Sequence, residues 1–247
     1  MCDHNDVSLA TSSDWESVCA ECGQVITAII ETERQRIAVN SSGLKFLIDK
    51  TAWEIDRRLP EFEQFIRGQL LTPLTGYSDR GGEYAIDNGA FSRFDVAKWG
   101  RLLRRQAESA DRCLFVTCPD IVGSAARTLD LWNNRHSVFA SECVAFADKF
   151  CLVAQDGVED MLIPWHELEW IFIGGGDPWK DSKAAQDVVR TAKMLGKFVH
   201  VGRVNTPKRF DLFADLGADT CDGSGVAMYD HMLENIAYRD TQKQLFD

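Results

Sequence analysis

The sequence lacks several features by which common classes of protein are recognised. No apolar run approaches the roughly 18 residues that a membrane-spanning helix requires, so we expect no membrane partner. Residues 1–6 contain no basic segment followed by an apolar one, and we therefore expect no secretory signal and a cytoplasmic location. No Gly-x-Gly-x-x-Gly motif follows the first expected strand, which disfavours a dinucleotide-binding fold.

Basic residues are outnumbered, since 27 lysines and arginines face 38 aspartates and glutamates and leave a net charge of −11. This balance weakly disfavours a nucleic-acid partner, although the catalytic face of an acidic protein can be locally basic. Two basic clusters occur, Arg101 with Arg104 and Arg105, and Lys208 with Arg209. Each has the composition of a solvated helix face.

The eight cysteines, in a chain with no expected secretory signal, indicate thiols or metal ligands rather than disulfides. Cys19 and Cys22 form a Cys-x-x-Cys pair followed by glycine, and Cys2 and His4 supply two further ligands upstream. Tetrahedral zinc takes four such ligands. We therefore expect a structural Zn²⁺ in a small N-terminal element over residues 1–25. The alternative is a disordered tail with a chance pair of cysteines.

Short apolar strands alternate with helical segments along the rest of the chain. Strands are expected at 44–48, 83–86, 113–117, 150–154, 170–173, 198–201 and 220–221, and helices at 26–38, 50–70, 124–148, 181–196 and 207–216. Such alternation requires parallel strands with helical crossovers. With 247 residues and 45% hydrophobic composition, the chain suits an α/β fold. We predict a (β/α)8 barrel of the TIM type over residues 26–247, with an open doubly wound sheet as the alternative.

The segments that directly follow the strands carry the polar chemistry. In a barrel these segments converge on one face, where barrel enzymes have their active sites. No lysine and no histidine cluster ends a strand, which disfavours a Schiff-base aldolase and a metal-dependent hydrolase. His200 lies inside its strand and is either a core histidine or a catalytic one. The segments contain Asp87, Asn88, Phe91, Asp120, Gln155, Gly174, Gly175, Gly176, Gly202, Arg203 and Asp222.

This set of side chains suits recognition of a flat, polar heterocycle. Carboxylates accept hydrogen bonds from ring N–H and amino groups, whereas a glutamine and backbone N–H groups donate to a carbonyl. One further carboxylate can act as a nucleophile or as an acid/base at a glycosidic carbon.

The order of these segments resembles that of the tRNA-guanine transglycosylases, and more closely that of their phage relatives that put 7-deazaguanines into DNA. The resemblance covers roughly residues 80–225. Residues 86–91 are similar to the family's Asp-Ser-Gly-Gly-Phe motif, 115–120 to its second base-binding strand, 152–155 to its Val-Gln-Gly strand and 173–176 to its Gly-Gly motif. Val201-Gly202 with Pro207 resembles the Gly-Val-Gly…Pro segment, and 217–222 resembles Gly-x-Asp-x-x-Asp.

The chain also departs from the family pattern. The family's C-terminal zinc site is absent, the chain is shorter than the tRNA enzymes, and Asn88 stands where the family has serine. These departures favour a compact relative that acts on DNA, with zinc at the N-terminus, and a phage origin would place it in the host cytoplasm.

The resemblance implies a double displacement in which a 7-deazaguanine replaces guanine in DNA. Asp222 would attack C1′ and form a covalent glycosyl intermediate, and Asp87 would serve as general acid/base. Asp120, Gln155 and the backbone of residues 174–176 would hold the base, which must first leave the duplex stack. The substrate-binding set would also include Asn88, Gly202, Arg203 and Phe91. Phe91 either stacks on the base or is a core aromatic.

Other functions remain open at this point. A DNA glycosylase of the same fold would use water as second nucleophile and excise a guanine or a modified base, as in phage–host conflict. A zinc-knuckle protein would bind nucleic acid without catalysis. A barrel enzyme for a small phosphorylated metabolite would use residues 174–176 and 223–225 as phosphate-binding loops.

We predict that freshly purified, untagged protein carries a structural Zn²⁺ bound by Cys2, His4, Cys19 and Cys22. Loss of the metal should destabilise the N-terminal element more than the barrel, because metal-binding free energy is folding free energy for a small element. Elemental analysis provides the measurement, and less than about half an equivalent of zinc would contradict the expected four-ligand site.

Overall fold

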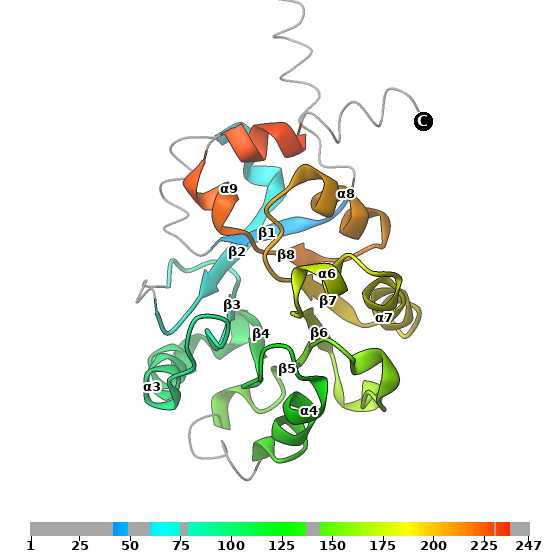
Figure 1. The fold of residues 1–247 in the computed structure, drawn as a ribbon. Coiled ribbons are helices and arrows are strands. Elements are labelled where there is room, and N and C mark those ends of the chain that lie inside the picture. The colour runs from blue at the N-terminus through cyan, green and yellow to red at the C-terminus, as the bar shows by residue number, and fades with distance from the viewer. Residues whose placement is uncertain (1–41, 49–59, 75–78, 137–143, 230, 238–247) are drawn as a thin grey trace, which may run out of the picture.

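Eight parallel strands form a closed barrel in which each strand pairs with the next and the last pairs with the first (Figure 1). The computed structural model describes residues 42–48, 60–74, 79–136, 144–229 and 231–237. The closed parallel barrel confirms the α/β prediction, is compatible with the TIM type and excludes the open sheet. The strands are β1 (Lys45–Ile48), β2 (Ile66–Leu71), β3 (Tyr84–Ile86), β4 (Cys113–Thr117), β5 (Phe150–Ala154), β6 (Trp170–Ile173), β7 (Phe198–Val201) and β8 (Thr220–Cys221).

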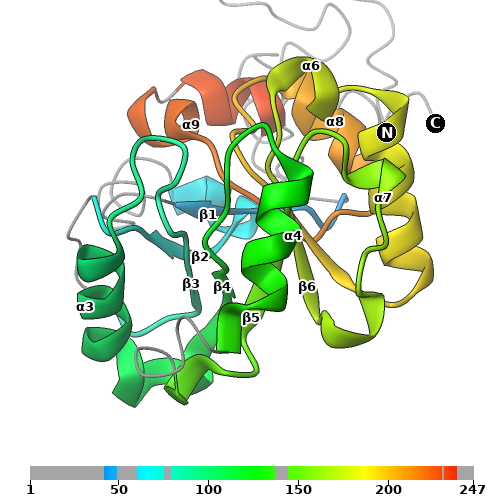
Figure 2. The same ribbon diagram turned by 60° about the horizontal axis from the view of Figure 1, so that its bottom comes forward.

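Helices lie around the outside of the strands (Figure 2). Three of them begin at side chains that accept a backbone N–H at the helix start, namely Asp95, Ser182 and Thr206. Among the described residues, no helix has the length and apolar character needed to cross a membrane. The labelled α-helices are α3 (Val96–Gln106), α4 (Ala125–Asn133), α6 (Asp177–Lys180), α7 (Lys183–Met194), α8 (Pro207–Asp215) and α9 (Ser224–Met228), and residues 231–237 are also helical.

Two of the helix predictions are wrong within the described residues. The segment predicted to be helical over 50–70 contains the 3-10 helix η1 (Pro60–Phe65) and then strand β2. Phe62 and Phe65 are buried at a spacing of three residues, which a 3-10 turn satisfies as well as an α-helix does. The helix predicted over 124–148 is interrupted after Asn133, where the side-chain amide of Asn134 donates to the Asp130 carbonyl. Residues 135–136 are helical again, and Val144–Phe146 form a 3-10 helix.

Other predicted segments lie outside the described residues. These are the zinc ligands Cys2, His4, Cys19 and Cys22 and the helix expected over 26–38. The zinc element therefore stays a prediction.

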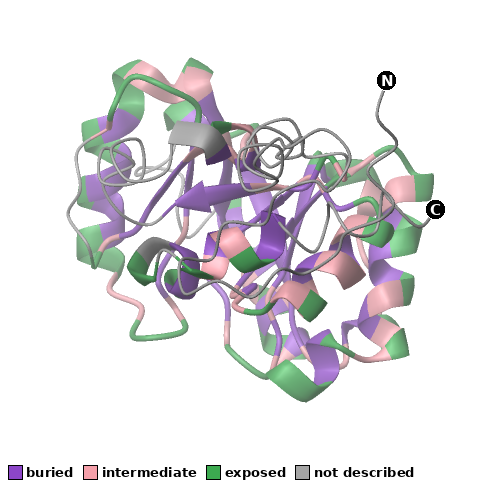
Figure 3. Cartoon of the chain, turned by 90° about the horizontal axis from the view of Figure 1, so that it is seen from above, coloured by how far each residue is buried: buried purple, intermediate pink, exposed green. Residues whose placement is uncertain are grey.

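Alternate residues of the strands fill the barrel interior, while the others pack against the helices. Figure 3 shows that the strands are largely buried. In the interior, the Phe115 ring lies 5.0 Å from that of Trp170, measured between centroids, and contacts Phe172 edge-on. The interior cluster comprises Leu47, Leu70, Ala85, Phe115, Cys151, Val153, Trp170 and Phe172. These side chains fill the barrel interior below the carboxyl ends of the strands.

Gly68 in β2 lies against the backbone that leads into β3. A Cβ placed on Gly68 would lie 2.1 Å from the Glu83 carbonyl oxygen. The adjacent Gln69 N–H donates to the same oxygen at 3.1 Å, so the two strands cannot separate without losing this bond.

We predict that Gly68→Ala lowers the free energy of unfolding by about 1–3 kcal/mol, because the methyl group has no space. Urea unfolding gives the measurement. Gly82→Ala is the matched control, since a Cβ there meets nothing within 4 Å. It should change stability by less than about 0.5 kcal/mol. Equal losses in both variants would show that the strand contact is not the cause.

Candidate active site

The candidate site lies at the carboxyl ends of the strands, where the first residues beyond the strands continue the inward-facing rows of the barrel interior. Residues two apart on a strand face the same side. Accordingly Ala85 is followed by Asp87, Val153 by Gln155, Phe172 by Gly174, His200 by Gly202 and Thr220 by Asp222. A small pocket with a cavity volume of about 70 Å³ occupies this end of the barrel. Its lining includes Asp87, Asn88, Phe91, Asp120, Gln155, Gly174, Gly175, Gly202, Arg203 and Asp222.

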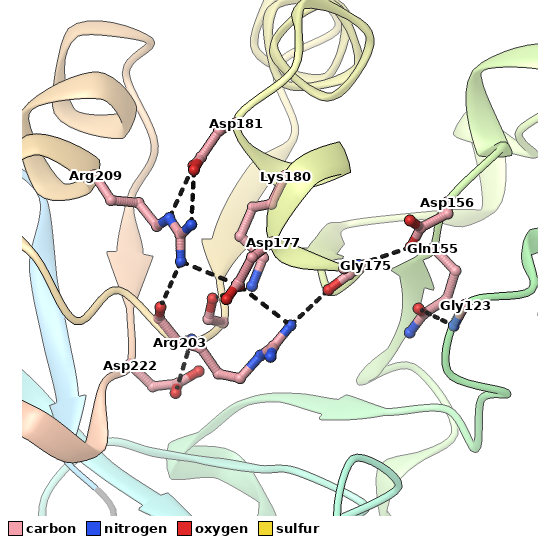
Figure 4. Close-up of polar contacts among 12 residues, drawn as sticks. Gly123, Gln155, Asp156, Gly175, Asp177, Lys180, Asp181, Arg203, Arg209 and Asp222 are labelled. Carbon is pink, nitrogen blue, oxygen red and sulfur yellow. Dashed lines mark hydrogen bonds and ion pairs between the residues drawn. The ribbon is translucent and has the colours of Figure 1, made fainter.

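Asp222, which follows β8, has both carboxylate oxygens held by donors. The backbone N–H of Arg203 donates to Oδ1 at 3.1 Å, and His200 Nε2 lies 3.0 Å from Oδ2. Figure 4 shows the Asp222 side chain beside the segment that carries Arg203. These donors stabilise the negative charge of Asp222 and fix the direction of the carboxylate.

His200 is fully buried in β7, yet one edge of its ring reaches the site. The ring packs against Phe115 and Phe172, with centroids at 5.0 and 4.6 Å. Its Nδ1 lies 2.8 Å from Thr220 Oγ1. A carboxylate oxygen accepts hydrogen bonds, so His200 Nε2 is the donor to Asp222, and the threonine hydroxyl is the partner of Nδ1. His200 is therefore both a core histidine and a positioning residue for Asp222.

Lys180 in α6 is a site residue that sequence reasoning missed, because it does not directly follow a strand. It lines the pocket, is fully buried, and donates from Nζ to the Gly202 carbonyl. Burial, followed by the nearby positive charge of Arg203, lowers its pKa to about 8. The Gly202 carbonyl and the Arg203 N–H belong to one peptide group. Lys180 and Asp222 therefore bind opposite ends of the same peptide bond.

Asp87, directly after β3, is the second carboxylate of the pocket. Burial raises the pKa of Asp87, and the negative charge of Asp222 raises it further. Its Oδ1 accepts weakly from the Gly89 N–H at 3.2 Å and from the Thr117 hydroxyl at 3.3 Å. Two carboxylates with different environments in one pocket favour one proton-carrying and one ionised group.

Asp120, Asn88 and Gln155 form a hydrogen-bonded row along the pocket wall. The Asn88 side-chain amide donates to Asp120 Oδ1 at 2.8 Å, and that of Gln155 donates to Oδ2 at 2.7 Å. Asn88 also donates to the Cys118 carbonyl, and Gln155 Oε1 accepts from the Gly123 N–H (Figure 4). Burial raises the pKa of Asp120 to about 6 despite these two donors. Both amides are thus committed to orienting Asp120.

The glycine loop after β6 is fixed by contacts that exclude any side chain. A Cβ at Gly174 would lie 2.7 Å from Val153, and one at Gly175, where φ is +50°, would lie 2.1 Å from the Trp179 ring. The Gly174 N–H donates to the Ala154 carbonyl, and the Gly176 N–H donates to Asp156 at 2.7 Å. Two of the three amides expected to hold a base are therefore bonded within the protein, and Gly176 is not among the lining residues.

Phe91 and Arg203 lie at the mouth of the pocket. Phe91 is 62% exposed, so it is not a core aromatic. The Arg203 guanidinium lies 4.1 Å from the centre of the Phe91 ring. It also donates to the Gly175 carbonyl at 2.6 Å (Figure 4). The pair presents a flat cationic and aromatic surface to any ligand that enters.

The described part of the chain contains no cluster of three or more histidine, cysteine, aspartate or glutamate side chains that would hold a metal ion. Asp219 is a structural residue, since its carboxylate accepts from the Val199 N–H and pairs with Lys193.

A comparison of the sequence with protein-family models and with curated proteins finds no match. Function must therefore be inferred from the site itself.

We predict that the stability difference between the wild type and Asp120→Asn depends on pH. The pKa of Asp120 is raised from 3.8 to about 6 in the folded protein, so folding favours its protonated form. Its contribution to stability is therefore full below about pH 4 and falls as the pH rises to about 6.

The wild type should lose roughly 3 kcal/mol relative to Asp120→Asn between pH 4 and pH 7, measured by urea unfolding at both values. Asp130→Asn, an exposed substitution of the same kind on α4, should show no comparable trend. A constant difference between wild type and Asp120→Asn would rule out a raised pKa at this position.

Proposed function

We propose that this protein is a transglycosylase that exchanges guanine in DNA for a 7-deazaguanine through a covalent aspartyl-glycosyl intermediate. The proposal rests chiefly on one observation: Asp87 and Asp222 line the same pocket but have different surroundings. Asp222 is held by two donors, whereas burial and the charge of Asp222 favour a proton on Asp87. This is the division that nucleophilic attack and general acid catalysis at a glycosidic carbon require.

In the first step, Asp222 forms a bond to C1′ of the nucleotide while the bond from C1′ to N9 of guanine breaks. The electron pair goes to the departing base, and Asp87 supplies the proton that neutralises it. In the second step, N9 of the 7-deazaguanine attacks C1′, its proton returns to Asp87, and the bond from Asp222 to C1′ breaks. Atoms and charge balance over the two steps, and no further reactant is needed.

The row of Asp120, Asn88 and Gln155 supports recognition of a guanine-like base. The two amides each occupy one oxygen of Asp120 and leave further acceptor sites on the carboxylate. Such a carboxylate suits the adjacent ring N–H and amino group of guanine, which 7-deazaguanines share. Phe91 and Arg203 at the mouth suit stacking on a base that has left the duplex.

A protein that only binds nucleic acid would not need this arrangement. A carboxylate with a raised pKa is costly in a pocket and is typical of catalytic sites. The buried Lys180 and His200 both act on the position of Asp222, which also fits a catalytic requirement better than a binding one.

We predict that Asp222→Asn abolishes base exchange and leaves DNA binding largely intact, because an amide keeps the volume but is a far poorer nucleophile. Asp87→Asn should slow exchange by about 10²–10⁴-fold, since it removes proton transfer. Asp130→Asn on α4 is the control and should exchange bases at the normal rate. Mass spectrometry of nucleosides and free bases, after incubation with DNA and a 7-deazaguanine, follows the reaction.

Omission of the incoming base should trap a protein–DNA adduct in the wild type and not in Asp222→Asn. Near-normal turnover by Asp222→Asn would remove this residue from the mechanism and the proposed function with it. Steady release of free base without an adduct would instead assign the protein as a glycosylase, with water as the attacking group.

A further inference from the structure

Helix α3 carries a basic face on a strongly acidic protein. Lys98, Arg101, Arg104 and Arg105 are all exposed, and Asp95, which caps the helix start, is the only acidic residue between positions 95 and 106. Lys98, Arg101 and Arg105 recur at intervals of three and four residues and so share one side of the helix. The surrounding chain has a net charge of −11, so this side is a local exception.

The basic side of α3 forms one wall of a groove of about 520 Å³. Thr72 and Pro73, which follow β2, form the opposite wall, and among the described lining residues there is no carboxylate. By helix geometry the three aligned cations span about 10 Å along the axis. That length corresponds to about three nucleotides of rise along a nucleic-acid strand.

The groove adjoins the candidate active site; it is lined by Thr72, Pro73, Lys98, Arg101, Leu102, Arg104 and Arg105. A Cβ built on Gly89 would contact both Pro73 and Leu74 at 3.6 Å. Gly89 lies between Asn88 and Ala90, and both of these line the active-site pocket. Pro73 of the groove therefore lies next to the turn that carries these pocket residues.

We propose that this groove binds the phosphodiester backbone of DNA next to the nucleotide whose base enters the pocket. A chain of phosphates matches the exposed cations Lys98 and Arg101, and Lys and Arg are the residues that neutralise phosphates in such interfaces. The choice of DNA rests on the proposed function, whereas the attraction to phosphates does not. The groove supplies affinity that is independent of base sequence, and the pocket supplies recognition of the base.

The test measures binding of a fluorescein-labelled duplex that contains only adenine and thymine, so that no guanine chemistry takes part. The variant is Lys98→Gln with Arg101→Gln in the full chain. Loss of two phosphate contacts should weaken binding roughly 50-fold at about 0.1 M salt and reduce the slope of log K against log salt by about 2. The matched control, Lys183→Gln with Arg190→Gln, removes the same charge from exposed positions on α7 and should change binding far less.

Unchanged affinity and salt slope in the α3 variant, or equal losses in the α7 control, would overturn the groove as the binding surface. Tighter binding of a matched adenine–uracil RNA duplex would overturn the assignment to DNA. If Asp222→Asn retained base exchange while the α3 variant still lost binding, the groove would stand and the proposed chemistry would fall. Circular dichroism of both double variants checks that the barrel is folded.

Discussion

The candidate site depends on one peptide group, the bond between Gly202 and Arg203. Its carbonyl accepts from the buried Lys180, and its N–H donates to Asp222, so a buried cation and a pocket carboxylate polarise the same amide in the same direction. The backbone at Arg203 has a φ of +60°, which costs about 1–3 kcal/mol for a residue with a side chain. The Arg203 guanidinium donates a hydrogen bond to the Gly175 carbonyl, and the Arg203 carbonyl accepts one from the Arg209 guanidinium. These two contacts hold the strained conformation. Without this conformation, the Arg203 N–H would not face Asp222.

The closed barrel explains why residues distant in sequence meet at this peptide. The interior is filled by aromatic and branched side chains up to the level of Phe172 and His200, and the next inward position on β3, β5, β6, β7 and β8 is polar or glycine. Gly202 is one such position: a Cβ there would lie 2.7 Å from the Phe172 ring and 3.4 Å from Asp222 Oδ2. The glycine therefore lets the β7 backbone approach both the core and the carboxylate. The position of the β7 backbone at Gly202 therefore depends on the packing of the core and also determines the geometry of the site.

Features with a local pattern could be predicted from the sequence, whereas features that depend on contacts between strands could not. Strands such as β5 and β6 are fully buried apolar runs bounded by glycine or polar residues, so both the strands and the polar positions after them could be found. Strand β2 could not, because Ile66 to Leu71 include an arginine, a glycine and a glutamine and show no alternation. Gly68 is explained by the close approach of the Glu83 carbonyl, which lies in the next strand connection. Lys180 lacked any local signal, whereas His200 had one: it lies two residues before Gly202 and so faces the same side.

The two carboxylates illustrate why the reaction was harder to infer than the fold. Asp87 and Asp222 look equivalent in the sequence, since each directly follows a strand. Their difference arises from partners that only the closed barrel brings together: His200 and the Arg203 N–H beside Asp222, and only two weak contacts beside Asp87. Burial raises the pKa of Asp87, and the negative charge of Asp222 raises it further. The groups that stabilise the candidate nucleophile thus also prepare the candidate acid, and removal of any of them should disturb both.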